Sequence, residues 1–140
     1  MFDRIMVVYD RSRSASQAFD RALKLGAPGN SEIGIAAVIR SVEFALDVGA
    51  QDALECSSAI LDQQMSHWAR RARFAGSAAT VFVRTGHPGT QIALAAKEWR
   101  ADLIVTGHSV SVWTFPWLWL SSSVSRQLLV LAPCPVLVVP

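Results

Sequence analysis

The stretch DLIVTG, residues 102 to 107, is a short apolar run that ends at a glycine. The segment before it, PGTQIALAAKEW at 88 to 99, repeats its apolar side chains every three or four residues and has Pro88 in place to open a helix. A run of this length and composition predicts a strand that is buried on both faces. A helix that leads into such a strand is one unit of a parallel sheet.

Similar units extend in both directions from this stretch. The other predicted strands are RIMVVYD (4 to 10), EIGIAAVIR (32 to 40), ATVFVRT (79 to 85) and PVLVVP (135 to 140). Helical patterns cover 14 to 27, 49 to 75, 88 to 99 and 121 to 132. Strict alternation of strand and helix predicts a doubly wound α/β domain, with a parallel sheet covered by helices on both faces. The 140 residues have room for one such domain, residues 1 to 140.

The helical patterns also predict which side chains face the sheet, because residues three or four apart lie on one side of a helix. These side chains are Ala18, Ala22 and Leu25 in the first helix, Leu54, Leu61, Met65, Trp68 and Ala72 in the second, and Ile92, Ala95, Ala96 and Trp99 in the third.

Composition and spacing exclude several classes of function. The formal net charge is only +2, and the one basic cluster, ARRAR at 69 to 73, is typical of a solvated helix face and not of a nucleic-acid surface. Cys56 and Cys134 lack the spacing of a zinc site or redox pair, so we expect two buried thiols. The three histidines have no partner at ligand spacing, so no metal site is predicted.

The chain ends are also informative about location. The first ten residues have no signal-peptide pattern, and we expect a cytoplasmic protein. The apolar stretch from 103 to 140 is interrupted by Gly107, by serines and by two prolines, so a membrane-spanning helix is not expected there.

In an open α/β sheet, ligands bind beyond the carboxyl ends of the strands. Asp10, Val38 and Gly107 lie at such ends and are the first candidate binding residues.

The chain resembles the universal stress protein family over nearly its whole length. The resemblance rests on RIMVVYDRSRSASQAFDRAL (4 to 23), GHPGTQIALAAKEWRADLIVTGH (86 to 108) and SVSRQLLVLAPCPVLVV (123 to 139). It implies the strand order 3-2-1-4-5. In many members it also implies a homodimer paired through the last strand, which here contains Val136, Leu137, Val138 and Val139.

Many members of this family bind ATP through an aspartate after strand one, a valine on strand two and a glycine-containing loop after strand four. By this resemblance Asp10, Val38 and Gly107 match. The loop then departs from the pattern: Val110 stands at the second glycine and Ser122 at the third, followed by Ser123 at the family's serine and by Val124. Valine is β-branched and poor at positive φ, so we expect a damaged phosphate site.

Two functions follow from these features. The favoured one is a non-enzymatic, dimeric binding or regulatory module that binds no cofactor and does not bind ATP tightly. The alternative is an ATP-binding member, weakly hydrolysing, that uses the modified loop 107 to 124. Ser122 and Ser123 could still cap a helix and hold a small anion there.

The segment VWTFPWLWL, 112 to 120, carries four large aromatic side chains: Trp113, Phe115, Trp117 and Trp119. Left in water, they would form an apolar patch larger than a soluble monomer usually shows. Three covers are open: the protein's own nucleotide cleft, a second subunit or protein partner, and a membrane interface. The membrane is the least favoured of the three, because no cationic side chain lies nearby.

Overall fold

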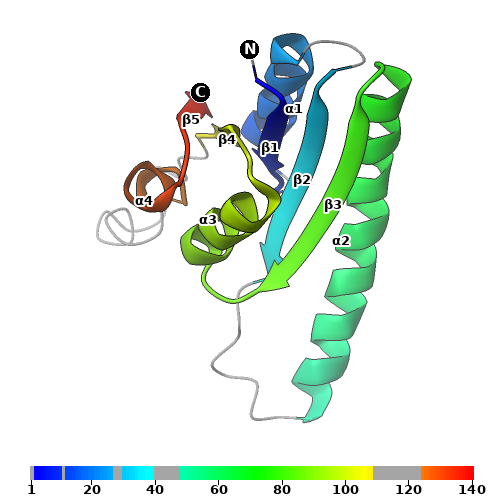
Figure 1. Ribbon diagram of the computed structural model, residues 1–140. Helices are drawn as coiled ribbons and strands as arrows, with labels where there is room; N and C mark the ends of the chain where they lie inside the picture. The colour runs from blue at the N-terminus through cyan, green and yellow to red at the C-terminus, as the bar shows by residue number, and fades with distance from the viewer. Residues whose placement is uncertain (1, 11, 27–29, 40–47, 109–123) are drawn as a thin grey trace.

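A computed structural model describes residues 2–10, 12–26, 30–39, 48–108 and 124–140 of the chain. The elements follow the predicted alternation of strand and helix, and their ends lie within three residues of the predicted ones (Figure 1). In chain order they are β1 (Arg4–Val8), α1 (Arg13–Leu25), β2 (Glu32–Ile39), α2 (Val48–Phe74), β3 (Ala78–Thr85), α3 (Pro88–Trp99), β4 (Leu103–Gly107), α4 (Val124–Leu131) and β5 (Val136–Val139).

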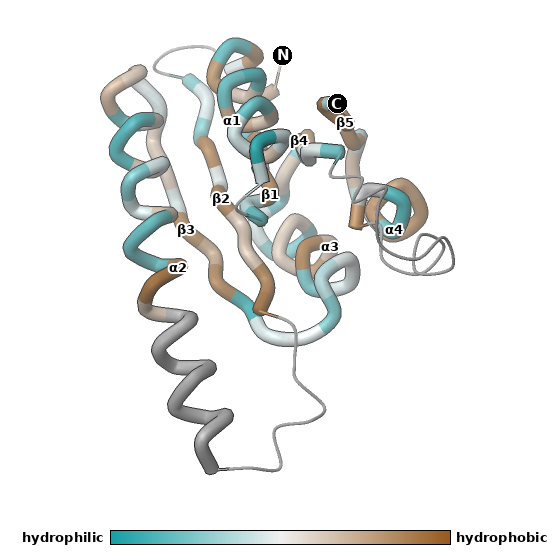
Figure 2. The backbone as a smooth tube through the Cα atoms, turned by 180° about the vertical axis from the view of Figure 1, so that it is seen from behind, coloured by the Kyte–Doolittle hydropathy of each residue, from teal (hydrophilic) through white to brown (hydrophobic). Residues whose placement is uncertain are grey.

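The strands form one parallel sheet in the order β3-β2-β1-β4-β5, which confirms the predicted fold. Ile5 of the central strand β1 lies between Ile33 of β2 and Leu103 of β4. α1 and α2 pack on one face of the sheet, and α3 and α4 pack on the other (Figure 1). The backbone coloured by hydropathy shows the apolar residues concentrated along the strands (Figure 2).

The core under α1 and α2 is built around an aromatic stack. The ring of Phe19 stacks on that of Trp68, with centroids 4.5 Å apart, and the Arg71 guanidinium lies 5.1 Å from the Phe19 ring. Three buried alanines bring α1 close to the sheet: Ala15, Ala18 and Ala22. The prediction for Leu25 was wrong, because this last residue of α1 is 37% exposed and Phe19 takes the larger core position.

The core under α3 and α4 also depends on small residues. Ala95 and Ala96 are fully buried, as is Ile92, so the predicted inner face of α3 is confirmed. Trp99 is half-buried and lies over β2, where a Cβ added to Gly34 would come 2.9 Å from its ring. Glycine at position 34 therefore makes room for the indole.

The edge strand β3 departs from the sequence prediction. It was expected to be buried, but its residues are half-buried or exposed, because an edge strand has a neighbour on one side only.

Cys134 was expected to be a buried thiol, but its side chain is half-buried. Burial raises the pKa of the Cys134 thiol, and the nearby Asp102 carboxylate raises it further. The side chain of Cys56 lies outside the described residues.

Asp102 fastens the start of the central strand. Its carboxylate accepts hydrogen bonds from the backbone N–H groups of Asp3, at 2.7 Å, and Arg4, at 3.1 Å. These bonds join the first strand to a residue almost a hundred positions later in the chain.

A helix that spans a membrane is both long and apolar. Within the described ranges, no helix is long and apolar enough to cross a bilayer.

Candidate functional site

The carboxyl ends of β1, β2 and β4 lie side by side at one edge of the sheet. Three of the candidate binding residues are there: Asp10 just after β1, Val38 near the end of β2 and Gly107 at the end of β4. The chain order reverses between β1 and β4, because β1 leads to β2 on one side and β4 returns on the other. This is the position at which open α/β sheets form their ligand crevice.

Asp10 shapes the turn from β1 into α1. One of its carboxylate oxygens accepts hydrogen bonds from the backbone N–H of Ser12, at 2.9 Å, and from the Ser12 hydroxyl. Ser12 is the N-cap of α1, and its hydroxyl oxygen accepts from the N–H of Ala15 at 3.1 Å. Asp10 therefore holds the capping residue in place. This structural role is separate from its match to the aspartate of the family's ATP site.

Gly107 has a structural role as well. A Cβ added at this buried position would lie 2.6 Å from the backbone nitrogen of Ala15, and closer still to the carbonyl carbon of Ser14. The first turn of α1 thus lies directly against the end of β4. Close packing of these two backbones requires glycine here, whether or not a ligand binds.

Val38 belongs to the other face of the sheet. Its half-buried side chain packs with Phe82 and Trp99 against the core under α3 and α4. Asp10, by contrast, leads into α1 on the opposite face. The structure therefore brings Asp10, Val38 and Gly107 to one edge of the sheet, but Val38 lies on the face covered by α3 and α4, whereas Asp10 leads to the face covered by α1 and α2.

The remaining candidates are distributed between described and undescribed residues. Val124 is the first residue of α4 and is half-buried against the core under α3 and α4. Val110, Ser122, Ser123, Trp113, Phe115, Trp117 and Trp119 lie outside the described residues. The interface candidates Val136, Leu137, Val138 and Val139 form β5, the other edge strand of the sheet.

The sequence did not reveal a polar cluster at the start of α3. His87 occupies the N-cap position, with its Nδ1 3.4 Å from the Thr90 hydroxyl and its Nε2 3.4 Å from the Gln127 side-chain nitrogen. Pro88 after His87 marked the helix start, but no local signal pointed to Gln127, forty residues away. Across the ranges that the structure describes, no group of three metal-ligating side chains occurs.

Gly89 is the reason that α3 and α4 meet at this cluster. A Cβ added to Gly89 would lie 2.6 Å from the Cβ of Gln127. Glycine thus allows the first turn of α3 to contact α4 directly. α3 and α4 therefore pack in direct contact beside the carboxyl edge of the sheet.

Known structures share this fold from end to end. The protein MJ0577 superposes with a TM-score of 0.85 at 19% sequence identity, covering 99% of this chain and 96% of that one. UspA from Lactobacillus plantarum gives 0.81 at 24% identity, with 99% and 97% covered. A universal stress protein in complex with cAMP gives 0.73 at 24% identity, with 99% and 96% covered.

Sequence comparison agrees with the structural one. No curated protein matches the chain at a significant level. The model of the universal stress protein family, however, matches residues 1–140. With the strand order, the candidate residues at the carboxyl edge and this match over the full sequence, the chain belongs to the universal stress protein family.

Proposed function

We propose that this protein is a non-enzymatic universal stress protein, a dimeric binding or regulatory module that does not bind ATP tightly. The observation that carries the proposal is the structural use of the residues that match the family's ATP site. Asp10 is hydrogen-bonded to the cap of α1, and Gly107 packs against Ser14 and Ala15. Both residues are thus needed by the fold without a ligand. Their presence is therefore weak support for nucleotide binding.

The loop sequence supports the same proposal. Val110 and Ser122 stand where the resemblance places glycines that bring backbone N–H groups to the triphosphate. Each lost donor to a charged oxygen forgoes about 1.5 to 3 kcal/mol. Two such losses turn a micromolar site into a millimolar one, so we expect a dissociation constant for ATP above roughly 100 μM.

Titration calorimetry with Mg-ATP on nucleotide-free protein tests this proposal. We expect no resolvable heat at micromolar ATP. The matched variant combines Val110→Gly with Ser122→Gly, and it should gain affinity if the missing glycines weaken the site. A low-micromolar constant for the wild-type protein, or ATP retained through purification, would overturn the proposal.

The alternative is a nucleotide-binding member that tolerates the altered loop. Two observations support it. The second carboxylate oxygen of Asp10 has no hydrogen-bond partner among the described residues, and it could accept from a hydroxyl group of a ligand. One structural relative is a universal stress protein in complex with cAMP. The same titration should therefore include cAMP, and micromolar binding of cAMP without ATP binding would favour a module for smaller nucleotides.

The open edge of β5 supports the dimeric part of the proposal. The carbonyls of Pro135 and Val139 face β4, where they accept from the N–H groups of Ile104 and His108 at 3.0 and 2.7 Å. Backbone groups alternate along a strand, so those of Val136 and Val138 face away from the sheet. An open apolar edge of this kind is prone to pair with another strand. A second copy could cover it by two-fold pairing.

A further inference from the structure

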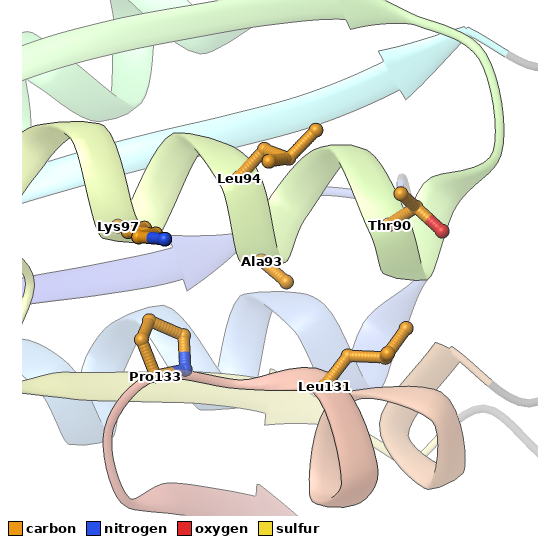
Figure 3. Close-up of a pocket in the computed structure, with 6 residues that line it drawn as sticks. All are labelled: Thr90, Ala93, Leu94, Lys97, Leu131 and Pro133. Atoms are coloured by element: carbon orange, nitrogen blue, oxygen red, sulfur yellow. The ribbon is translucent and has the colours of Figure 1, made fainter.

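An apolar groove lies between α3 and the end of α4, away from the sheet (Figure 3). Its volume is about 180 Å³. Leu94 of α3 and Leu131 of α4 line it and are 43% and 48% exposed. The described residues that line it are Thr90, Ala93, Leu94 and Lys97 from α3, with Leu131 and Pro133 from the end of α4 and the turn that follows.

Two more apolar residues of α4, next to Leu131 in the sequence, are exposed. Leu129 is 66% exposed and Val130 is 82% exposed, so with Leu131 three consecutive apolar residues of this helix reach solvent. A helix that packs only against its own sheet would place polar residues at such positions. Three exposed apolar residues in a row exceed the singly scattered ones that are normal on a soluble surface, and they favour an interaction site on this side of the molecule.

Lys97 gives the groove its charge. Among the residues that the structure describes, no aspartate or glutamate lines the groove. Within the described chain, the Lys97 amino group has neither a hydrogen bond nor an ion pair, whereas its neighbour Glu98 is paired with Arg84 at 2.5 Å. The groove is therefore an apolar surface with one available cation, and its complement is an apolar group next to an anion.

The size of the groove selects the kind of ligand. Small-molecule and cofactor sites usually enclose about 300 to 1,000 Å³. The present groove is smaller and open along one side, and it has room for one or two aliphatic side chains. One recurring mode of protein recognition places the apolar face of an amphipathic helix in a hydrophobic groove of this kind.

We propose that the groove between α3 and α4 binds an amphipathic helix of a partner protein. An aliphatic side chain of that helix enters between Leu94 and Leu131, and a carboxylate about one turn away pairs with Lys97. The proposal deepens the function proposed above, because it names the partner class of the binding module. It uses none of Asp10, Gly107 or the loop after β4, so the ATP titration and the following experiment can fail separately.

The test selects ligands from a displayed library of random helix-forming peptides, using the full-length protein as bait. Peptides that also bind the double variant Leu94→Arg, Leu131→Arg are removed. We expect the remaining peptides to share an aliphatic residue with Asp or Glu three or four positions away. The matched control is Leu25→Arg, which changes an exposed leucine on α1 and should bind the selected peptides as the wild-type protein does.

Charge reversal then tests the role of Lys97. Lys97→Glu should weaken binding of a selected peptide roughly three- to tenfold, a modest effect because exposed ion pairs are weak. A peptide with its acid replaced by lysine should recover that loss on the Lys97→Glu protein only. Circular dichroism establishes that each variant is folded.

Three outcomes would overturn the proposal. One is a selection with no enrichment over the double variant, and another is a set of selected peptides without acidic residues. The third is a change in oligomeric state: if Leu94→Arg, Leu131→Arg turns a dimer into a monomer in sedimentation without any peptide, the groove is covered by a second copy of the chain.

Discussion

Gly107 is the residue on which two adjoining parts of the molecule depend. It ends β4, and the first turn of α1 lies against it without room for a Cβ. A glycine in a binding loop is readily attributed to the ligand. Here the ligand-free fold already requires one, because two backbones approach each other at this point.

Gly107→Ala should therefore destabilise the protein even when no nucleotide is present. We expect a loss of about 1 to 3 kcal/mol in the free energy of unfolding, the usual cost of an added methyl group in a packed site. Urea denaturation followed by circular dichroism measures this. Gly26→Ala is the control, because its φ of −74° suits alanine and its nearest neighbour, the Ser31 Cβ, would be 3.2 Å away. Equal losses for the two variants would contradict the packing argument.

Cys134 predicts a pH dependence of stability. Its thiol has a raised pKa in the folded protein, so the folded state holds this proton more tightly than the unfolded chain does. The resulting stability is fully present below the ordinary cysteine pKa of about 8.5, and it is lost as the pH rises through the folded value. Urea denaturation between pH 7 and 10 should show a steeper fall for the wild-type protein than for Cys134→Ala. Parallel curves for the two proteins would refute this expectation.

Among the elements, β5 is the one whose environment changes most if a dimer forms. Val138→Pro removes a backbone N–H that faces away from β4, so the internal ladder keeps its bonds while the open edge loses a donor. We expect this variant to sediment as a folded monomer at concentrations where the wild-type protein is a dimer. Val138→Thr keeps the N–H and should remain dimeric. A monomeric wild-type protein at micromolar concentration would remove the dimer from the proposed function.

The helices show how far periodicity alone predicts packing. Spacing correctly placed Ala18, Ala22, Ile92, Ala95 and Ala96 in the core. Spacing failed at Leu25, because the apolar pattern of a helix does not tell which of its end residues lie against the sheet. Phe19 lies on the edge of the same stripe and stacks on Trp68 of another helix, a contact that no local pattern specifies.

At the scale of the whole molecule, the alternation of apolar runs and helical patterns was sufficient to predict a doubly wound domain. The strand order came from the family resemblance, because periodicity does not say which strands are neighbours. The candidate site, too, was predicted only in part. Asp10, Val38 and Gly107 reached one edge as expected, whereas the contacts of Gly107 with Ser14 and of Gly89 with Gln127 join distant segments that meet only in three dimensions.

The pairing of β1 has a consequence for the order of events during synthesis. The strand Arg4–Val8 leaves the ribosome before the other strands of the sheet, yet one of its two partners is Leu103–Val105. The central strand stays without that neighbour until the chain has been made as far as residues 103 to 105, almost a hundred positions later. Its apolar side chains are open to wrong contacts over that interval, as is usual for sheets built from distant segments. A nascent chain stalled before residue 103 should therefore stay bound to chaperones, and one extended past β5 should be released.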